Sequence, residues 1–251
     1  STGIYLTSSD SSEKLDMEGG SGLQNVTIDN GLVGYWKLDD GSGSSIARDS
    51  SRYGNDGTLT TMDTDQDWIL NTSPAGNTGT TFYNPYSLDF DGSSDHIVLA
   101  NGTTLRIDDP FKPFSIALWF KTTTTGNQSF FDNYDGGQEN IGIRFVSSKV
   151  NFFVRDIGGN VANPISTSTY ADGSWHHTTT TWDGAGKAKV IMDGSDSASD
   201  TDTLVDTSLD SASAFHIGNR PSGDLYLNGT LDDVRIYNRA LSSGEITNLA
   251  S

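Results

Sequence analysis

A chain of 251 residues that carries 33 acidic and 15 basic side chains has a formal net charge of −18. Such a surface repels phosphate backbones, which excludes nucleic acid as an expected partner. The absence of cysteine excludes a disulfide framework and a thiolate site, and no apolar run approaches the roughly 18–20 residues that span a membrane. Frequent Gly, Ser and Thr together with many aromatic residues favour one large all-β domain of short strands joined by turns.

The N-terminal residues 1–30 differ from the rest of the chain. A Ser/Gly-rich centre separates two short β-like pieces, Ile4–Thr7 and Leu23–Ile28. We interpret this segment as an extended N-terminal arm or linker. It either follows a removed leader or pairs with a neighbouring chain by adding a strand. A start at Ser1 rather than Met suggests the removed leader.

Strand patterns separated by turn residues recur from Gly31 to the C-terminus. In FSIALWFK, residues 114–121, every second side chain is large and apolar, which predicts a strand with one face in the core. Further strands are predicted in LVGYWKL, YSLDFDGSSDHIVL, IGIRFV, KVNFFVRD, WHHTTTTWDG, AKVIMDG, FHIGN and LDDVRIYNRAL. The tryptophans of these patterns are expected in the core: Trp36, Trp119, Trp175 and Trp182.

Two polar tracts and one helix interrupt the strand patterns. Residues 60–86 form a long polar insertion that contains several aromatic residues, and residues 193–213 form a second polar tract. Ser242 and Glu245 have the spacing of a capping box, which predicts one short C-terminal helix.

Seven of these motifs together resemble a known family. GLVGYWKLDDGSG, DSSRYGNDGTL, SLDFDGSSDHIVL, FSIALWFK, GSWHHTTTTWDG, FHIGN and NGTLDDVRIYNRALSSGEI occur in this order. They look like the laminin G-like branch of the concanavalin A-like lectin/glucanase superfamily, as found in microbial secreted proteins. The resemblance covers residues 31–251 and implies a two-sheet antiparallel jelly-roll sandwich, a fold that serves lectins, adhesins, spacer modules and hydrolases alike.

The resemblance also implies a structural calcium ion. In the family, a loop similar to DSSRYGNDGTL helps to hold Ca²⁺ with an Asp near the last strand, which points here to Asp49, Asn55 and either Asp232 or Asp233. Carboxylates and turn carbonyls are the hard oxygen ligands that Ca²⁺ takes. The alternative is an ordinary turn in which Asp49 accepts hydrogen bonds from backbone N–H groups. The Arg52–Tyr53 pair departs from the family pattern.

Two further patterns suggest metal sites but do not meet the requirements of one. Asp63–Trp68 begins like an EF-hand loop, but Trp68 stands where that loop needs Gly and Pro74 where it needs Glu. His176 and His177 are adjacent on a predicted strand, so their side chains point to opposite faces. We expect a polar surface loop and two structural histidines.

An enzymatic role is not predicted. Glycoside hydrolysis needs two carboxylates across the scissile bond, and the chain has only four Glu, none in the arrangement found in glucanases of the superfamily. Sugar binding would use aromatic rings, for which the candidates are Trp68, Tyr83, Tyr86, Phe130 and Tyr134. The alternative for these rings is that they cover a sheet and anchor loops.

The sequence therefore predicts an extracellular or cell-surface, prokaryotic, non-catalytic module for glycan binding or adhesion, stabilised by calcium. The alternatives are a structural subunit of a surface filament or layer that assembles through residues 1–30, and a glycoside-active enzyme. Five N-x-S/T sequons are a weak indication of glycosylation: Asn25, Asn71, Asn101, Asn127 and Asn228.

Overall fold

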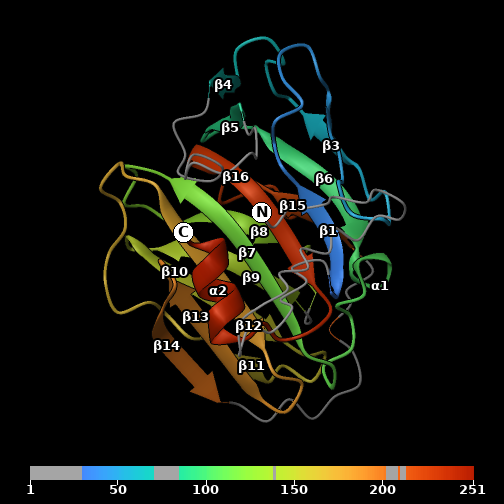
Figure 1. Cartoon of the computed structure of the whole chain (residues 1–251), viewed down its shortest axis with the longest axis vertical. Helices are drawn as coiled ribbons and strands as arrows, with labels where there is room; N and C mark the ends of the chain where they lie inside the picture. The colour runs from blue at the N-terminus through green and yellow to red at the C-terminus, as the bar shows by residue number, and fades with distance from the viewer. Residues whose placement is uncertain (1–29, 71–84, 138–139, 202–208, 210–212) are drawn as a thin grey trace, which may run out of the picture.

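Two antiparallel β-sheets form the protein, as a computed structural model shows (Figure 1). The structure describes residues 30–70, 85–137, 140–201, 209 and 213–251. The predicted all-β sandwich with a short C-terminal helix is confirmed. The predicted arm, residues 1–30, lies outside the described residues except for Asn30. Within the described part of the chain, no helix is long and apolar enough to cross a membrane.

The first sheet has eight strands in the order β14-β13-β12-β7-β16-β5-β4, with β1 paired to β16. Their bounds are β1 Leu32–Trp36, β4 Trp68–Leu70, β5 Tyr86–Asp91, β7 Phe114–Lys121, β12 His176–Trp182, β13 Lys187–Met192, β14 Ser195–Thr201 and β16 Asn228–Tyr237. The long central strand β16 therefore joins the start of the domain to its middle, since it pairs with β1, β5 and β7.

The second sheet also has eight strands, in the order β11-β10-β9-β8-β15-β6-β3-β2. Their bounds are β2 Ile46–Ala47, β3 Gly57–Thr60, β6 His96–Asn101, β8 Gln128–Asp132, β9 Asn140–Val146, β10 Lys149–Arg155, β11 Val161–Ala162 and β15 Ala214–Ile217. A short helix, α1 Gly102–Leu105, follows β6 and is not foreseen by the sequence patterns.

The core lies between the sheets and follows the predicted alternation. The apolar residues of β7 pack with phenylalanines of the second sheet, such as Phe152, whose ring centroid lies 6.1 Å from that of Phe114. Trp36 and Trp182 are completely buried there. Trp119 is also buried, although it points to the outer face of β7 with His177. Trp175 is only partly buried and precedes β12, so it is not the core residue expected.

Helix α2, Ser243–Leu249, covers part of the outer face of the first sheet (Figure 1). Both halves of the predicted capping box are present at Ser242 and Glu245. Ile246 and Leu249 pack with Ala117 of β7 in a second apolar cluster. The predicted helix is thus confirmed, and its apolar side is what attaches it to the sheet.

Both polar tracts contribute edge strands. Residues 193–213 contain β14, which pairs with β13, and residues 60–86 contain β4, which pairs with β5. Each of these strands ends the pairing order of the first sheet, where polar side chains protect the edge from further strand pairing. Pairing, rather than apolar alternation, therefore makes β14 a strand.

The two adjacent histidines at the start of β12 have separate structural roles, as predicted. The His176 ring lies 3.0 Å through Nδ1 from Asp193 and 3.2 Å through Nε2 from Asp172. The His177 ring is buried on the other face and packs edge-on against Trp119 at 5.1 Å between centroids.

Candidate functional site

The predicted calcium loop is organised around the carboxylate of Asp49. Its Oδ1 accepts hydrogen bonds from the backbone N–H of Tyr35 and of Ser51, both at 2.8 Å. Its Oδ2 accepts from the Ser51 hydroxyl and from the Asn55 backbone N–H, both at 2.7 Å. Four donors thus meet the lone pairs of one carboxylate, which is how an Asp fixes a turn.

Asn55 ties the same loop to β1. Its backbone carbonyl accepts from the Trp36 indole N–H at 2.9 Å, and its side-chain amide donates to the Val33 carbonyl at 3.0 Å. Gly54 has a φ of +66°, a left-handed conformation that glycine adopts without strain. The loop is therefore closed by protein groups on both sides.

The last strand does meet this region, because β1 pairs with β16. Asp233 lies in a bulge of β16 at a φ of +55° and forms an ion pair with Arg235 at 2.9 Å. Arg235 also donates to the Tyr35 hydroxyl at 3.0 Å and lies over the Tyr35 ring. Asp232 is buried in β16 opposite Trp119.

Two of the predicted calcium ligands, Asp49 and Asp233, are already engaged by other protein groups. The oxygens of Asp49 already accept four hydrogen bonds, and Asp233 faces a guanidinium group. Among the residues that the structure describes, no group of three or more His, Asp or Glu side chains is placed to hold a metal ion. The calcium ion stays a prediction that chelation tests.

Two of the predicted sugar-stacking rings, Trp68 and Phe130, are buried. Trp68 is 5% exposed and its indole N–H donates to the Ser44 carbonyl at 3.0 Å. Tyr86 is partly buried against the core. Tyr83 lies outside the described residues. Trp68 is therefore a core residue, which corrects its assignment as a candidate stacking ring.

Phe130 is also a core residue, for a reason that strand alternation cannot supply. Its ring packs at 4.6 Å from that of Phe120 and at 5.6 Å from that of Phe145. A register shift in β8 between Ser129 and Phe131 lets two successive phenylalanines face the core. Phe130 is completely buried and offers no ring face to a sugar.

Tyr134 differs from these rings, since it lies at the outer face of the second sheet. Arg144 of β9 lies 5.9 Å from its ring centroid, and Arg220, in the connection between β15 and β16, lies 5.0 Å from it. The Tyr134 backbone carbonyl accepts a hydrogen bond from the Ser222 N–H at 3.0 Å, so that connection is fixed beside the ring.

An ion pair between Asp132 of β8 and Arg144 of β9 forms the centre of this outer face. Arg144 Nε lies 2.6 Å from Asp132 Oδ2, and Asp132 Oδ1 accepts from the Tyr134 N–H at 2.9 Å and from the Asn140 amide at 3.1 Å. Burial raises the pKa of Asp132, and the Arg144 guanidinium works against that rise. Arg144 also lies over the ring of Phe153, 4.6 Å from its centroid.

Gly142, in the middle of β9, makes room for this ion pair. A Cβ at this position would stand 2.6 Å from Asp132 Oδ2 and 3.3 Å from Arg144 Nε. Glycine inside a strand often marks such a close approach. In register, Gly142 lies between Asp132 on β8 and Phe153 on β10, so the ion pair passes over the strand where no side chain blocks it.

Two stacked histidines continue the same face toward the other edge of the sheet. The rings of His96 on β6 and His216 on β15 are 5.0 Å apart with an interplanar angle of 17°. Tyr226 meets His96 edge-on at 6.4 Å, and His216 Nδ1 lies 2.7 Å from the Asn219 side-chain oxygen. Burial lowers the pKa of His216. His216 stands opposite Asp132 in register.

We call this surface the sheet-face site. It consists of Asp132, Tyr134, Arg144, Phe153, His96, His216, Arg220 and Tyr226. Apart from the buried Asp132, these side chains are partly exposed. Arg220 pairs with Asp224, whose Oδ1 accepts from Arg220 Nε at 2.8 Å. The site therefore presents planar rings and guanidinium groups whose charges are already balanced by carboxylates.

Of the predicted site residues, only Tyr134 belongs to the sheet-face site. The sequence patterns do not predict the other members, because these residues come from five separate segments of the chain. A signal was present in IGIRFV and KVNFFVRD, where Gly142, Arg144 and Phe153 occupy positions between the core residues. An arginine and an aromatic residue on the outward positions of neighbouring strands indicate a recognition surface.

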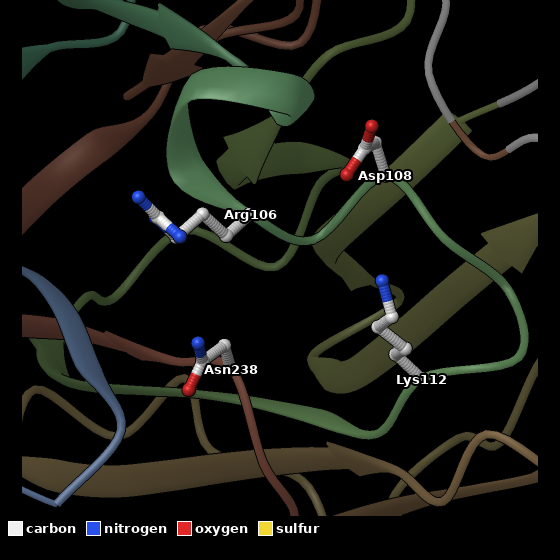
Figure 2. Close-up of a pocket in the computed structure, with 4 residues that line it drawn as sticks. All are labelled: Arg106, Asp108, Lys112 and Asn238. Carbon is white, nitrogen blue, oxygen red and sulfur yellow. The ribbon is translucent and has the colours of Figure 1, made fainter.

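A separate cavity of about 210 Å³ shares no lining residue with the sheet-face site. It is lined by Arg106 and Asp108, which follow α1, by Lys112 before β7, and by Asn238 after β16. Figure 2 shows the Lys112 ammonium and the Asn238 amide reaching toward the same hollow, with Asp108 on the opposite side. None of the four lining residues is among the site residues predicted from the sequence.

Two sequons are on the described surface. Asn127 is exposed in the turn before β8. Asn228 is exposed at the start of β16, where its side-chain amide donates to the Asp91 carbonyl at 3.3 Å. Asn25, Asn71 and the side chain of Asn101 lie outside the described part.

Comparison with known proteins gives a family match and several similar folds. The family model for the concanavalin A-like lectin/glucanases superfamily matches residues 91–247. No curated protein matches the sequence.

Similar solved structures include one domain of an enzyme and the binding domains of two toxins. One is domain 4 of AbnA, a GH43 extracellular arabinanase from Geobacillus stearothermophilus, which was solved in complex with arabinotriose. It has 21% identity and a TM-score of 0.64 over 88% of this chain and 98% of that one. The receptor binding domain of botulinum neurotoxin C/D mosaic serotype has 15% identity and a TM-score of 0.66 over 88% of this chain and 51% of that one. The binding domain of Paraclostridial Mosquitocidal Protein 1 has 17% identity and a TM-score of 0.64 over 89% and 52%. This chain spans about half the length of the two toxin domains.

Proposed function

Because the chain belongs to the concanavalin A-like lectin/glucanases superfamily, we propose that it is a non-catalytic module that binds glycans at the sheet-face site. The single observation that carries this proposal is the fixed Asp132–Arg144 pair, which holds a guanidinium group beside the rings of Tyr134 and Phe153. Rings supply apolar faces for pyranose or furanose rings, and the guanidinium supplies directed donors for hydroxyl groups.

The site is prepared for binding before a ligand arrives. Asp132 receives hydrogen bonds from a backbone N–H and an amide in addition to its ion pair, so the rotamer of Arg144 is held. A group that is already ordered loses less conformational entropy when it binds. The second arginine, Arg220, is held in the same way by Asp224.

The carboxylates of the site favour binding over hydrolysis. A glycosidase needs one carboxylic acid and one carboxylate that face each other across the bond. Here Asp132 is completely buried and Asp224 is engaged, each by its own arginine. Neither carboxylate is presented as a free acid or nucleophile.

The similar structures support this proposal and a place outside the cell. Domain 4 of AbnA is part of an extracellular arabinanase and was solved with arabinotriose, and the two toxin domains are named as binding domains. By analogy, we place this chain in an extracellular or cell-surface setting, with a glycan or a glycosylated surface as its partner.

A glycan array followed by calorimetry tests the proposal. The variants Phe153→Ala and Tyr134→Ala should lower the affinity for the selected oligosaccharide at least about tenfold, since each removes a stacking ring. Phe111→Ala is the matched control, because Phe111 is a ring that is 57% exposed outside the site. An array without any bound glycan, or equal affinities of the Phe153 and Phe111 variants, would contradict the proposal.

A further inference from the structure

Two arginines of this acidic chain differ from five others in having no ion pair with a carboxylate among the described residues. Arg48, Arg144, Arg220, Arg235 and Arg239 each form an ion pair with a carboxylate. Arg52 and Arg106 form no ion pair with any residue in the described ranges. Acidic residues outnumber basic ones by 33 to 15, so two adjacent arginines without a carboxylate are a feature that requires an explanation.

These two arginines meet at one aromatic ring. The guanidinium carbon of Arg52 lies 5.0 Å from the ring centroid of Tyr53, and that of Arg106 lies 4.9 Å from it. Arg52 also donates to the Tyr53 hydroxyl at 2.9 Å. The pair Arg52–Tyr53 is where the loop departs from its family pattern. The Tyr53 ring brings the guanidinium groups of Arg52 and Arg106 together. The aromatic face compensates for part of the repulsion between two cations.

Arg106 connects this arginine pair to the cavity of Figure 2. It lines the hollow with Lys112 and Asn238. The hollow is thus bordered by one guanidinium group without an ion pair, by one ammonium group that pairs with Asp109, and by one amide. Arg106 adopts a φ of +59°, a conformation that is unfavourable for residues with a side chain and that is concentrated at functional sites. The volume of about 210 Å³ is below the roughly 300–1,000 Å³ of pockets that enclose a whole drug-sized ligand. It suits one charged group of a ligand.

We propose that the Arg106–Lys112–Asn238 cavity binds an oxyanion, namely a carboxylate or sulfate group of an acidic sugar or a free inorganic oxyanion. Arginine and lysine provide charge-assisted hydrogen bonds to such oxygens, and the Asn238 amide adds a neutral donor. Arg52 adds positive charge beside the cavity through Tyr53. The site is separate from the sheet-face site, with which it shares no residue.

Two carboxylates adjoin the cavity and set its selectivity. Asp109 pairs with Lys112 at 3.1 Å, and Asp108 lines the hollow itself. Asp108 opposes an anion and would attract a cation. The substitution Asp108→Asn therefore gives a test of sign, because it should strengthen the binding of an oxyanion and weaken the binding of a metal ion.

The experiment titrates the full chain with three probes: sodium sulfate, an oligogalacturonate and a heparin-derived oligosaccharide. We expect saturable binding that weakens as salt is added and that Arg106→Gln reduces at least about tenfold, since a hydrogen bond to a charged group is lost. Arg48→Gln is the matched control, because Arg48 is an exposed arginine whose side chain is 72% accessible. Asp108→Asn should tighten the same complex.

The three probes distinguish a free oxyanion from an acidic glycan as the ligand. Binding of sulfate alone, lost in Arg106→Gln, identifies a free oxyanion as the ligand, whereas tighter binding of one of the oligosaccharides identifies an acidic glycan. Phe153→Ala should leave both unchanged, which separates this site from the proposed glycan site. The proposal is overturned if no probe binds, if Arg106→Gln and Arg48→Gln bind equally, or if Asp108→Asn weakens binding.

Discussion

Removal of the Asp49 carboxylate should unfold the loop that the family resemblance assigns to calcium, with or without the ion. Asp49 accepts two hydrogen bonds at 2.8 Å and two at 2.7 Å. Hydrogen bonds to charged groups are worth about 1.5–3 kcal/mol each. Asp49 is half-buried and its donors regain water when it is removed, so we expect Asp49→Ala to lower the free energy of unfolding by about 2–4 kcal/mol in total.

Two further variants calibrate this value. Asp49→Asn keeps one carbonyl oxygen, so it should lose about half as much as Asp49→Ala. Asp56→Ala removes one hydrogen bond of the same loop, from the Asp49 N–H at 2.8 Å, and should cost about 1 kcal/mol. Urea unfolding followed by tryptophan fluorescence reports all three, because the Trp36 indole is bonded to the loop.

The same measurements, repeated after chelation and after addition of calcium, decide how the carboxylate acts. If protein donors alone satisfy Asp49, chelation leaves the wild-type midpoint unchanged and the cost of Asp49→Ala is equal in both conditions. A ligand bound only by the native state would stabilise it by mass action. A wild-type midpoint that falls on chelation, together with an Asp49→Ala variant that does not respond, would refute this reasoning and favour the calcium clip.

Three further predictions concern the sheet-face site, the helix and pH. Gly142→Ala should reduce glycan affinity more than about tenfold and cost about 1–3 kcal/mol of stability, because its Cβ displaces Asp132; Gly126→Ala, whose Cβ would meet no atom closer than 3.9 Å, is the calorimetric control. Ser242→Ala should cost about 1 kcal/mol in urea unfolding through loss of the capping box, and an equal cost of Ser243→Ala would contradict this. Burial lowers the pKa of His177 from 6.5 to about 4. Between these two pH values, the His177 side chain is protonated in the unfolded chain and not in the folded one. Stability is therefore full above pH 6.5 and falls by up to about 3 kcal/mol toward pH 4; a His177→Gln variant with the same pH profile would disprove it.

The sequence predicted those parts of the fold that local rules determine. Alternation placed Phe114, Ile116 and Phe120 in the core, and the spacing of Ser242 and Glu245 located α2. Both rules act within a few residues of chain, where side-chain periodicity and backbone capping decide the structure.

The sheet-face site could not be predicted in the same way. Asp132 and Arg144 meet only because β8 pairs with β9, and the register of that pairing is shifted by an irregularity between Ser129 and Phe131. One such shift reverses which side chains face the core. It explains why Phe130 is buried while Tyr134, four residues later, reaches the outer face. Contacts between separate strands set this site, and a single sequence does not contain them explicitly.

The arginines of this chain divide by their electrostatic state, and this division predicts how the two proposed sites differ. At the sheet-face site, Arg144 and Arg220 are neutralised by Asp132 and Asp224, so they contribute shape and directed donors with little net field. At the cavity, Arg106 acts as an uncompensated charge in a molecule with a net charge of −18. At ordinary salt, charges more than about 8–10 Å from the cavity are largely screened, so an anion there interacts mainly with Arg106 and the other charged groups beside it.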